Sequence, residues 1–411
     1  MSIWTHTSHR GVFMSRIIGI RHRIKKTKDG EARPTQLSII ESGVCTTYEL
    51  ESELSEHDFL VGAFPIKWKK LEEGEESDPN IPIRHLKGSA VRREVPIEYD
   101  GLRSGDKVAM ALGGSGDYFA FALSLHGETI GAEVFRITPA KLKEARGESE
   151  KNDDTQLLAE LLQDNPELFL DTTPKDRNLI LLREVYDQLE QARKDRIACE
   201  QRIMQLVIGK TYCTPELYHA GALEKAFDTA KSNNKLLALL KSEEARLQKD
   251  VEEALGNFPI WTEVLTHVHG CGPKTAARII AGAGDVRKFA NIAKWKAYCG
   301  VHLMRAEEGP EGPEFIFPRR RSGQVSNWND QCRQGFYLMV QYWIKTKDSE
   351  WGQKFLQYKA NFQAKHPEVV VSGKRKMYTK GHIHQMATAR TMTRFAEYMY
   401  RQWSRLENEA Q

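Results

Sequence analysis

The sequence predicts an α/β domain followed by an all-α region, and three observations support this division. First, short β-rich runs open the chain, at Arg16–His22, Gln36–Glu41 and Val44–Glu49, and a strand–glycine turn–helix–strand unit follows them. Second, apolar residues recur at every third or fourth position over two long stretches after Pro174. Third, the remainder of the chain carries mainly helical patterns.

The composition is ordinary for a water-soluble globular protein. The chain has 411 residues, of which 40% are hydrophobic and 28% charged, and this length suits two or three domains. No apolar run approaches the ~20 residues that cross a membrane, and the first residues lack the apolar core of a secretion signal. Six cysteines without a C-x-x-C pair favour a reducing cytoplasm over a zinc or disulfide framework. Met14 is an alternative start of the folded chain.

The N-terminal domain is predicted to span residues 14–173. Its βαβ unit comprises a buried strand, a glycine turn, a helix and a second strand, at Lys107–Leu112, Gly113–Gly116, Tyr118–His126 and Thr129–Ile137. A further helix is expected at Thr155–Leu162. The charged, proline-containing residues 67–100 are expected to form a long surface insertion.

Two long amphipathic helices are predicted within residues 174–257, at Pro174–Gly209 and Leu223–Leu255. Their apolar spacing is compatible with an antiparallel or coiled-coil arm through which two copies dimerise. An intramolecular helical hairpin explains the same spacing.

Residues 258–411 are predicted to form a helical domain around the segment Val268–Ile280, VHGCGPKTAARII. A tight Gly-x-Gly turn there separates a helix at Phe258–His267 from a helix that Pro273 opens. Backbone amides at such a helix start suit a nucleic-acid phosphate, and the pattern looks like a helix-hairpin-helix. The residues predicted to contact nucleic acid here are Gly270, Gly272, Lys274, Thr275 and Arg278. The alternative is a helical hairpin whose glycines only permit close packing.

The rest of this domain is expected to contain four helices and a basic surface. The helices are predicted at Phe289–Cys299, Trp328–Trp343, Phe355–Lys365 and Ile383–Trp403, with a loop at Glu307–Pro318. Residues 300–411 carry an excess of about seven positive charges. Arg319, Arg320 and Arg321 belong to this excess, which suits a polyanionic partner or a solvated basic face.

Two serines beside these arginines are candidate nucleophiles. Ser322 and Ser326 lie in the segment that follows Arg321, where guanidinium groups can stabilise charge developing on a phosphate. Ser326 or Asn327 also suits the N-cap of the following helix. His382 and His384, two residues apart, suit either a metal or a structural role.

Paired carboxylates around Mg²⁺ are the chemistry that an RNase H-like nuclease domain would use, but this chain offers few acids. Asp153 and Asp154 stand at the start of a predicted helix, and Asp117 is either a further acid or a helix-start charge. The first strand ends in Arg21 and His22, and the βαβ strand ends in glycines. Asp153 and Asp154 alone cannot make a two-metal site.

Taken in order, these segments resemble the Piv-type insertion-sequence transposases, a group that includes the bridge-RNA-guided recombinases. The segments that carry the resemblance are residues 268–301, with "GD-x-x-x-F" and a "YxG" helix end, residues 319–339, residues 378–403, and GIRHR, GGSGDYF and EKNDDTQLLAEL in the N-terminal half. The resemblance implies an RNase H/RuvC-like N-terminal domain, a coiled-coil arm and a helical transposase domain. It also implies DNA, a structured guide RNA and a dimer or tetramer as partners.

Members of this family are expected to use four acids and a serine. Carried over by position, the first acid falls at Arg21 or His22, the second at Gly113, the third at Asp153, which matches, and the fourth near Gln156. The serine falls at Glu308-Gly309 or, with a gap, at Ser322-Gly323, and Ser326 fits the next serine of the pattern. The predicted function is therefore a transposase or DNA recombinase with a serine nucleophile, Asp153 and Asp154 keeping Mg²⁺ if the acidic site is active. The alternatives are a degenerate relative that binds DNA or RNA without cleavage and a purely structural helical protein.

Overall fold

The computed structural model of the chain describes residues 16–24, 32–72, 83–86, 92–112, 114–148, 153–309, 312–318, 323, 326–372 and 375–409. The chain divides into two compact units, Met1–Arg177 and Asn178–Gln411. Each unit has its own hydrophobic core, and each is described separately below.

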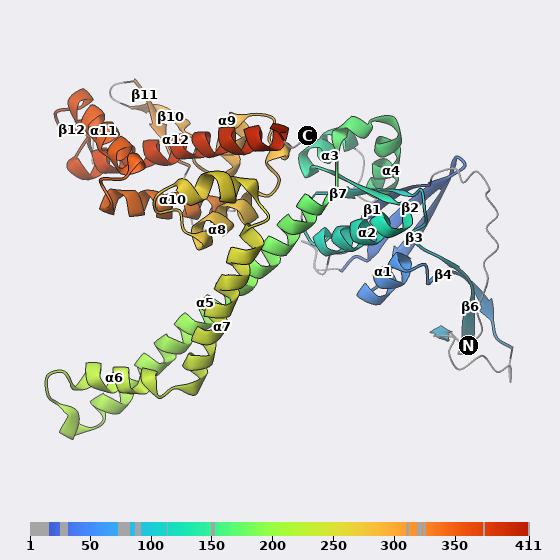
Figure 1. Cartoon of the computed structure of the whole chain (residues 1–411), viewed down its shortest axis with the longest axis horizontal. Helices are drawn as coiled ribbons and strands as arrows, with labels where there is room; N and C mark the ends of the chain where they lie inside the picture. The colour runs from blue at the N-terminus through green and yellow to red at the C-terminus, as the bar shows by residue number, and fades with distance from the viewer. Residues whose placement is uncertain are drawn as a thin grey trace. The chain divides into compact units, whose positions relative to one another are not determined.

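A six-stranded mixed sheet organises the first unit, with the strand order β3-β2-β1-β7-β8-β9 (Figure 1). The strands are β1 (Ile17–Arg21), β2 (Thr35–Glu41), β3 (Val44–Leu50), β7 (Lys107–Ala111), β8 (Glu133–Ile137) and β9 (Phe169–Asp171). Strands β1, β2 and β3 are antiparallel neighbours, whereas β7 pairs in parallel with both β1 and β8. This topology agrees with the predicted α/β class of the N-terminal half.

Helices cover both faces of this sheet. On one face lie α1 (Glu53–Leu60) and α2 (Asp117–Ile130), and on the other lie α3 (Pro139–Arg146) and α4 (Asp154–Asp164). Because side chains alternate along a strand, Val108 packs with the α2 residue Phe119 while the next residue, Ala109, packs with Leu158 of α4. The carboxyl ends of β1 and β7 therefore meet between the two helical layers.

Gly19 of β1 sets how closely α4 approaches the sheet. A Cβ atom at Gly19 would lie 1.8 Å from the carbonyl oxygen of Thr155, the second residue of α4. The hydroxyl of Ser38 donates a hydrogen bond of 2.8 Å to the hydroxyl of Thr155, which ties β2 to the same turn. The start of α4 is thus held directly against the backbone of β1.

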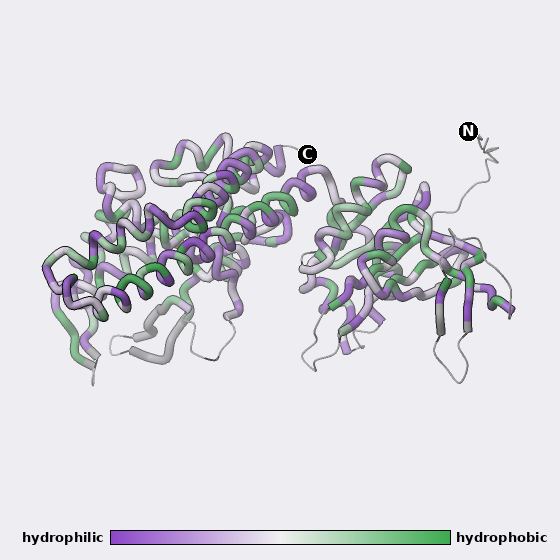
Figure 2. The backbone as a smooth tube through the Cα atoms, turned by 90° about the horizontal axis from the view of Figure 1, so that it is seen from below, coloured by the Kyte–Doolittle hydropathy of each residue, from purple (hydrophilic) through white to green (hydrophobic). Residues whose placement is uncertain are grey.

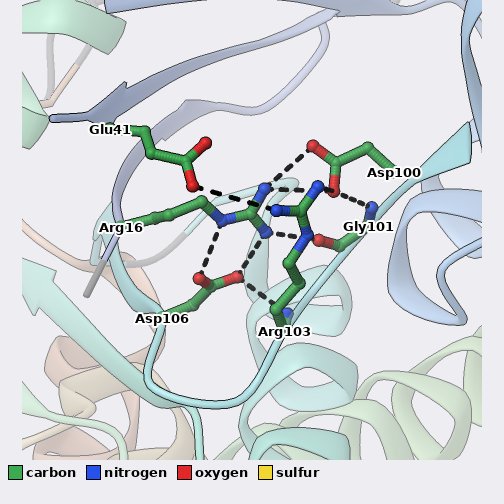
Figure 3. A network of polar contacts seen from close by, with 6 residues as sticks. All are labelled: Arg16, Glu41, Asp100, Gly101, Arg103 and Asp106. Carbon is green, nitrogen blue, oxygen red and sulfur yellow. Dashed lines mark hydrogen bonds and ion pairs between the residues drawn. The ribbon is translucent and has the colours of Figure 1, made fainter. Parts of the chain in front are cut away.

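Arg16 joins the start of β1 to two other parts of the first unit (Figure 3). Its guanidinium, 3% exposed, donates hydrogen bonds to Asp106, to Asp100 and to the carbonyl of Gly101. Burial opposes the charged form, but the hydrogen bonds and charges of Asp106 and Asp100 outweigh it and raise the pKa of Arg16. Arg103, which is more exposed, also reaches Asp100, at 2.8 Å.

The structure corrects two expectations in the first unit and shows one helix that was not predicted. Residues 67–100 are more than a surface insertion, because β4 (Phe64–Lys70), β5 (Arg84–Leu86) and β6 (Arg92–Asp100) form an antiparallel sheet in the order β4-β6-β5. The strand expected at Thr129–Ile137 begins only at Glu133, because α2 continues to Ile130 and ends at Gly131 in the left-handed conformation. Helix α1 was not predicted, since its apolar residues show no helical periodicity.

In the second unit a long helical hairpin is formed within one chain. Helix α5 (Pro174–Tyr212) is followed by α6 (Ala222–Ser232) and α7 (Lys235–Leu255), and α7 runs back beside α5 (Figure 1). An ion pair between Arg196 and Glu244 and a small apolar cluster around Leu237 hold the two helices together. The predicted helix Leu223–Leu255 is therefore two helices, with Asn234 capping α7. Dimerisation through this arm stays a prediction.

The remaining helices of the second unit surround a core of aromatic side chains. They are α8 (Pro273–Ala283), α9 (Ile292–Tyr298), α10 (Asp330–Lys345), α11 (Glu350–Lys365) and α12 (Lys380–Glu409). Trp295 of α9 is fully buried, donates its indole N–H to the carbonyl of Ala396 and stacks edge-on against Phe336 and Trp403. Figure 2 shows hydrophobic and hydrophilic residues following one another along these helices, as their amphipathic sequence requires.

Two further expectations in this unit are corrected. The region Phe258–His267 contains a short π-helix, Ile260–Val264, and a 3-10 turn, Leu265–His267, in place of a regular α-helix. The region Glu307–Pro318 is a hairpin more than a loop, because β10 (Met304–Gly309) pairs with β11 (Gly312–Ile316). A second small hairpin pairs β12 (Val370–Ser372) with β13 (Arg375–Met377).

Two surface properties complete the description. Within the described ranges, no helix combines the length and apolar character that a membrane span needs. Cys45 and Cys213 are exposed, whereas the other four cysteines, Cys199, Cys271, Cys299 and Cys332, are buried. Burial raises the pKa of Cys271 to about 12, so its thiol stays protonated at neutral pH.

Replacing Arg16 with methionine is expected to destabilise the first unit by about 3–5 kcal/mol, because Asp106 would remain buried without its counter-ion and Asp100 would keep only the more exposed Arg103. Hydrogen exchange of the β1 and β7 amides in the full chain measures this change. Arg103→Met is the control, since Arg103 is 46% exposed and its loss should cost less than about 1 kcal/mol. Equal effects of the two substitutions would contradict the role given to Arg16.

Candidate nucleic-acid interface

The glycine turn before α8 is shaped by Gly270. Its φ is +86°, a left-handed conformation, and a Cβ atom there would lie 2.2 Å from the ring of Tyr342 in α10. The carbonyl of the preceding residue, His269, accepts a hydrogen bond of 2.7 Å from the indole of Trp343. Gly270 therefore permits close packing. This is the role that the alternative interpretation, a simple helical hairpin, gave to both glycines of the turn.

Gly272 has no such packing contact. It is exposed, and no atom lies within 4 Å of the position that a Cβ atom would take. It is the N-cap of α8 and has no side chain to cap the helix. Pro273 carries no N–H, and the amides of Thr275 and Ala276 both point to the carbonyl of Gly272. In this geometry the amide of Lys274 lies at the second helical position, where a helix offers no acceptor of its own. The start of α8 thus keeps the features predicted to suit an anion.

Lys274 supplies a cation at this helix start. Its side chain is 31% exposed, and its Nζ lies 3.7 Å from Glu244 of α7. Burial is the main cause that lowers the pKa of Lys274, followed by the nearby charge of Arg193. Thr275, the next residue, is half-buried. Lys274 and Thr275 therefore remain predicted phosphate contacts beside Gly272.

Arg278 lies in the interior of the second unit. Its side chain is 3% exposed and donates to Glu190 at 2.7 Å and to the hydroxyl of Tyr186 at 2.5 Å. Both partners belong to α5, so the guanidinium ties α8 to the arm. The structure therefore argues against the phosphate contact predicted for Arg278, because a phosphate would have to replace Glu190 in a buried position.

The "GD-x-x-x-F" segment after α8 has a structural role in this chain. Asp285 accepts hydrogen bonds from the backbone and side chain of Arg287, which shapes a 3-10 turn, Val286–Lys288. Phe289 packs edge-on against Trp295 and Tyr298 of α9. The motif therefore directs the chain from α8 into the aromatic core.

The "YxG" end of α9 provides a rigid base for the segment before α10. Gly300 has φ +65°, and a Cβ atom there would lie 2.6 Å from the indole ring of Trp328. The guanidinium of Arg333 in α10 lies over the Trp328 ring, 5.1 Å from the ring centroid. It also donates a hydrogen bond of 2.5 Å to the carbonyl of Pro318. Both ends of the segment 318–328 are thus fixed.

Ser326 lies on this base, but it is not the N-cap of α10. That position belongs to Asn329, whose side chain accepts from the amide of Cys332 and donates to the carbonyl of Gly282. The expected caps, Ser326 and Asn327, are therefore wrong. The hydroxyl of Ser326 is half-buried and lies 3.4 Å from the carbonyl of Trp328. Arg319, Arg320, Arg321 and Ser322 lie outside the described residues, and Gly323 is exposed with φ +77°.

His382 and His384 have different partners. The ring of His382 stacks with Tyr378 at 5.6 Å and accepts a hydrogen bond from the backbone amide of Tyr378. The ring of His384 meets Phe355 of α11 edge-on. These contacts give both histidines structural roles at the start of α12.

Arginines engage two of the predicted acids of the first unit, Asp154 and Asp117. Asp153 is the exposed N-cap residue of α4, whereas Asp154 is 8% exposed and receives two hydrogen bonds from Arg146, of 2.5 and 2.9 Å. Arg21, at the end of β1, feels the charge of Asp154, and burial is the main cause that lowers the pKa of Arg21. Asp117 is also engaged, because it starts α2 and pairs with the buried Arg136 of β8.

These residues do not fit the Mg²⁺ site that the resemblance implies. Both oxygens of Asp154 face a guanidinium, and the strand position expected to carry an acid carries Arg21. Across the part of the chain that the structure describes, no three His, Cys, Asp or Glu side chains gather as ligands of one ion. We therefore assign Asp154 to an ion pair with Arg146.

Sequence reasoning missed the partners that fix this region. Tyr186 and Glu190 lie on a predicted amphipathic helix, but nothing in the sequence pairs them with Arg278, which is 92 residues from Tyr186. Asn329 could have been recognised as the N-cap of α10, because Asn is a favoured N-cap residue and an acidic residue, Asp330, follows it. Trp328 could be connected to Gly300 only once the helices were in place.

Comparison with known proteins adds one finding. Residues 262–312 match the family model of the transposase IS116/IS110/IS902 family. The matched segment includes the glycine turn, α8, the "GD-x-x-x-F" segment, α9 and β10. It supports a transposase of that family. None of the curated proteins compared with the chain matches it significantly.

Lys274→Ala is expected to weaken DNA binding and to reduce the slope of log K against log salt by about 0.9, because one phosphate contact is lost. Titrations of the full chain with duplex DNA at several salt concentrations measure both effects. The control is Lys235→Ala, an exposed lysine at the start of α7. An unchanged salt slope for Lys274→Ala would show that the start of α8 does not contact phosphate.

Arg278→Met is expected to act on stability first, because Glu190 would keep only Arg193, at 3.5 Å, as a cationic partner and the hydroxyl of Tyr186 would lose its donor. We expect the free energy of unfolding to fall by about 3 kcal/mol, because Arg278 is buried and Glu190 is only 17% exposed. Urea unfolding followed by the emission of the buried tryptophans of the second unit measures it. A variant of native stability with weakened DNA binding would instead restore Arg278 as a phosphate contact.

Proposed function

We propose that this chain is a transposase that acts as a site-specific DNA recombinase and exchanges strands through a serine nucleophile. The observation that carries the proposal is the transposase-family match over residues 262–312, which falls on the open start of α8 and on the segment leading to β10. The first unit supports it by its topology. Three antiparallel strands followed by two parallel strands with helices on both faces are what an RNase H/RuvC-like domain would need.

The proposed roles of the residues follow from their chemistry. The amide of Lys274 and its ammonium group hold a backbone phosphate without reading bases. Arg319, Arg320 and Arg321 hold the phosphate that is cut, and their guanidinium groups stabilise the charge that develops on it. Ser322 or Ser326 attacks phosphorus and displaces a sugar oxygen. The covalent phosphoserine ester is then attacked by a sugar hydroxyl of the second strand, which frees the serine.

The fixed base of Ser326 supports this assignment. Gly300 and Trp328 hold the segment on one side, and Asn329 ties it to the carbonyl of Gly282 in α8. A nucleophile gains from such a base because the reacting atoms must be held close to their productive geometry. Ser322 lies four residues earlier in the same segment, so either hydroxyl stays a candidate.

The proposed partners are DNA, a structured guide RNA and further copies of the chain. DNA binding is what a transposase requires, whereas the RNA and the oligomer rest on the family resemblance. Joining two DNA sites needs more than one protomer, so a dimer or tetramer is proposed.

A second function is favoured by one observation in the first unit. Arg21 and Arg146 stand where an acidic site would bind a cation, and Asp154 is neutralised. If strand cleavage requires the carboxylates of an intact acidic site, a chain with arginines at these positions binds DNA or RNA without cutting it. The two functions differ in whether a covalent intermediate forms.

The test begins with purification of the full chain and sequencing of the nucleic acid that accompanies it. A discrete structured RNA is expected, and strand exchange is then measured with that RNA and DNA of the flanking sequence. Loss of the covalent protein–DNA adduct in Ser322→Ala or Ser326→Ala identifies the nucleophile, since only one hydroxyl can carry the phosphate. Ser232→Ala, an exposed serine at the end of α6, is the matched control.

The results separate the two functions. An adduct that survives both serine substitutions would contradict a nucleophile in this segment. DNA or RNA binding without any adduct would support the non-cleaving function. A purified chain that carries no nucleic acid and ignores added DNA would contradict both.

A further inference from the structure

A serine, a histidine and a glutamate converge in the first unit at the carboxyl ends of two neighbouring parallel strands. His22 directly follows β1, and Ser115 lies in the turn between β7 and α2. Glu56 projects from α1, which covers the same face of the sheet. Substrates of α/β proteins bind at this edge of a parallel sheet, because loops there bring side chains of several strands together.

His22 lies within hydrogen-bonding distance of both Ser115 and Glu56. The hydroxyl oxygen of Ser115 lies 2.9 Å from Nδ1 of His22, and Nε2 of His22 lies 3.2 Å from the carboxylate of Glu56. When Nε2 carries the proton and donates it to Glu56, Nδ1 is left as an acceptor. The carbonyl of Arg23, at 3.1 Å, is the second group that the Ser115 hydroxyl reaches. The serine proton therefore has an imidazole base within hydrogen-bonding distance.

Glu56 is built to hold the imidazole in this tautomer. Its side chain is 9% exposed and accepts a hydrogen bond of 2.6 Å from the hydroxyl of Thr35, and the Nε of Arg23 lies 3.6 Å from the same oxygen. Burial alone would raise the pKa of Glu56, but the hydrogen bonds of His22 and Thr35 and the charges of His22 and Arg23 lower it. The carboxylate therefore stays ionised and orients the ring.

Packing fixes the ring from its other sides. A Cβ atom at Gly116 would lie 3.0 Å from Cβ of His22, so the glycine after Ser115 lets the turn approach the histidine. The ring of Phe119 in α2 lies 6.4 Å away, and the His22 side chain is only 11% exposed. Ser115, in contrast, is exposed. A buried, oriented base thus stands beside a hydroxyl that solutes can reach.

The surroundings favour an anionic substrate. Ser115 precedes α2, a helix of 14 residues whose N-cap is a glycine without a side-chain cap, and amides at such a start attract negative charge. Arg23, the residue after His22, is paired with Glu53 and Glu56 of α1, whereas Arg21 lies near Asp154 of α4, on the opposite face of the sheet. The start of α2, which no side chain caps, therefore suits a phosphate ester better than a neutral carboxylic ester.

We propose that Ser115, His22 and Glu56 form a second nucleophilic site that takes a phosphoryl group from phosphodiesters. The Ser115 oxygen forms a bond to phosphorus while Nδ1 of His22 takes the hydroxyl proton. The bond from phosphorus to one ester oxygen breaks, and the leaving alcohol takes the proton from His22. Water or another hydroxyl then attacks the phosphoserine ester by the same base and frees Ser115. The proposal does not depend on strand exchange through Ser322 or Ser326.

The experiment treats the full chain, without nucleic acid, with diisopropyl fluorophosphate and locates the adduct by peptide mass spectrometry. Labelling of Ser115 is expected, and Ser115→Ala should remove it. His22→Gln should slow it by about 100-fold or more, because the general base is lost. Glu56→Gln should slow it on the order of 100-fold, because the ring loses its orienting charge. Ser104→Ala, an exposed turn serine, should leave it unchanged.

Chemical rescue separates a base from a packing role. In His22→Gly, added imidazole should restore labelling of Ser115, and a residue that merely supports the fold would give no such recovery. Glu56→Asp should restore part of the rate lost in Glu56→Gln, since it returns the carboxylate. Ser115 labelled no faster than Ser104, or equally fast with and without His22, would overturn the proposal.

The substrate class is tested with bis(p-nitrophenyl) phosphate and p-nitrophenyl acetate. The phosphodiester should release a first equivalent of p-nitrophenol per chain in a burst, while a nitrophenyl phosphate forms on Ser115, and further p-nitrophenol as water frees the serine. Reaction of Ser115 with the acetate alone would overturn the phosphoryl class and make the site an acyl-transfer site.

Discussion

The buried guanidinium of Arg16 is the contact on which the first unit depends most. It holds the start of β1 against Asp100, where β6 ends, and against Asp106, just before β7 begins. The backbone continues the connection, because the amide of Lys107 donates to the carbonyl of Arg16. The parallel pairing of β1 with β7 starts from this point. Because that pairing fixes which residues end side by side, it also places His22 next to Ser115.

A second buried arginine plays a comparable part in the other unit. Arg278 connects α8 to Tyr186 and Glu190 of α5, so the helix start that carries Lys274 is held by the arm. In both units a guanidinium with fixed partners positions groups that are more exposed. A further arginine, Arg146 at the end of α3, pairs with Asp154 at the start of α4. Arg16, Arg278 and Arg146 thus each have a structural role that the sequence alone did not indicate.

Periodicity predicted the long elements well. The helices α5, α10, α11 and α12 and the strands β1, β2, β3 and β7 all coincide with predicted segments, and all of them except the largely exposed β3 bury several apolar side chains. Residues 67–100 were missed as a sheet because charged residues interrupt their β-rich runs, as in the segment Lys67–Lys70.

The candidate sites were less accessible to sequence reasoning. Lys274 and Gly272 could be chosen because a helix start is a local pattern. Ser115 and His22 are 93 residues apart, and Glu56 comes from a helix that was not predicted. Arg278 was assigned to phosphate because its charge is visible in the sequence, whereas its burial is decided by α5.

The distribution of cysteines has a practical consequence for studying the two units. Cys45 stands exposed on β3 of the first unit, and Cys213 stands exposed just after α5 in the second. The remaining four thiols are buried, and at Cys271 burial keeps the thiol protonated. Thiol-directed dyes will therefore attach to one position in each unit of the unmodified chain. Energy transfer between such a pair would report the distance between the units, and its change when DNA binds, without any engineered cysteine.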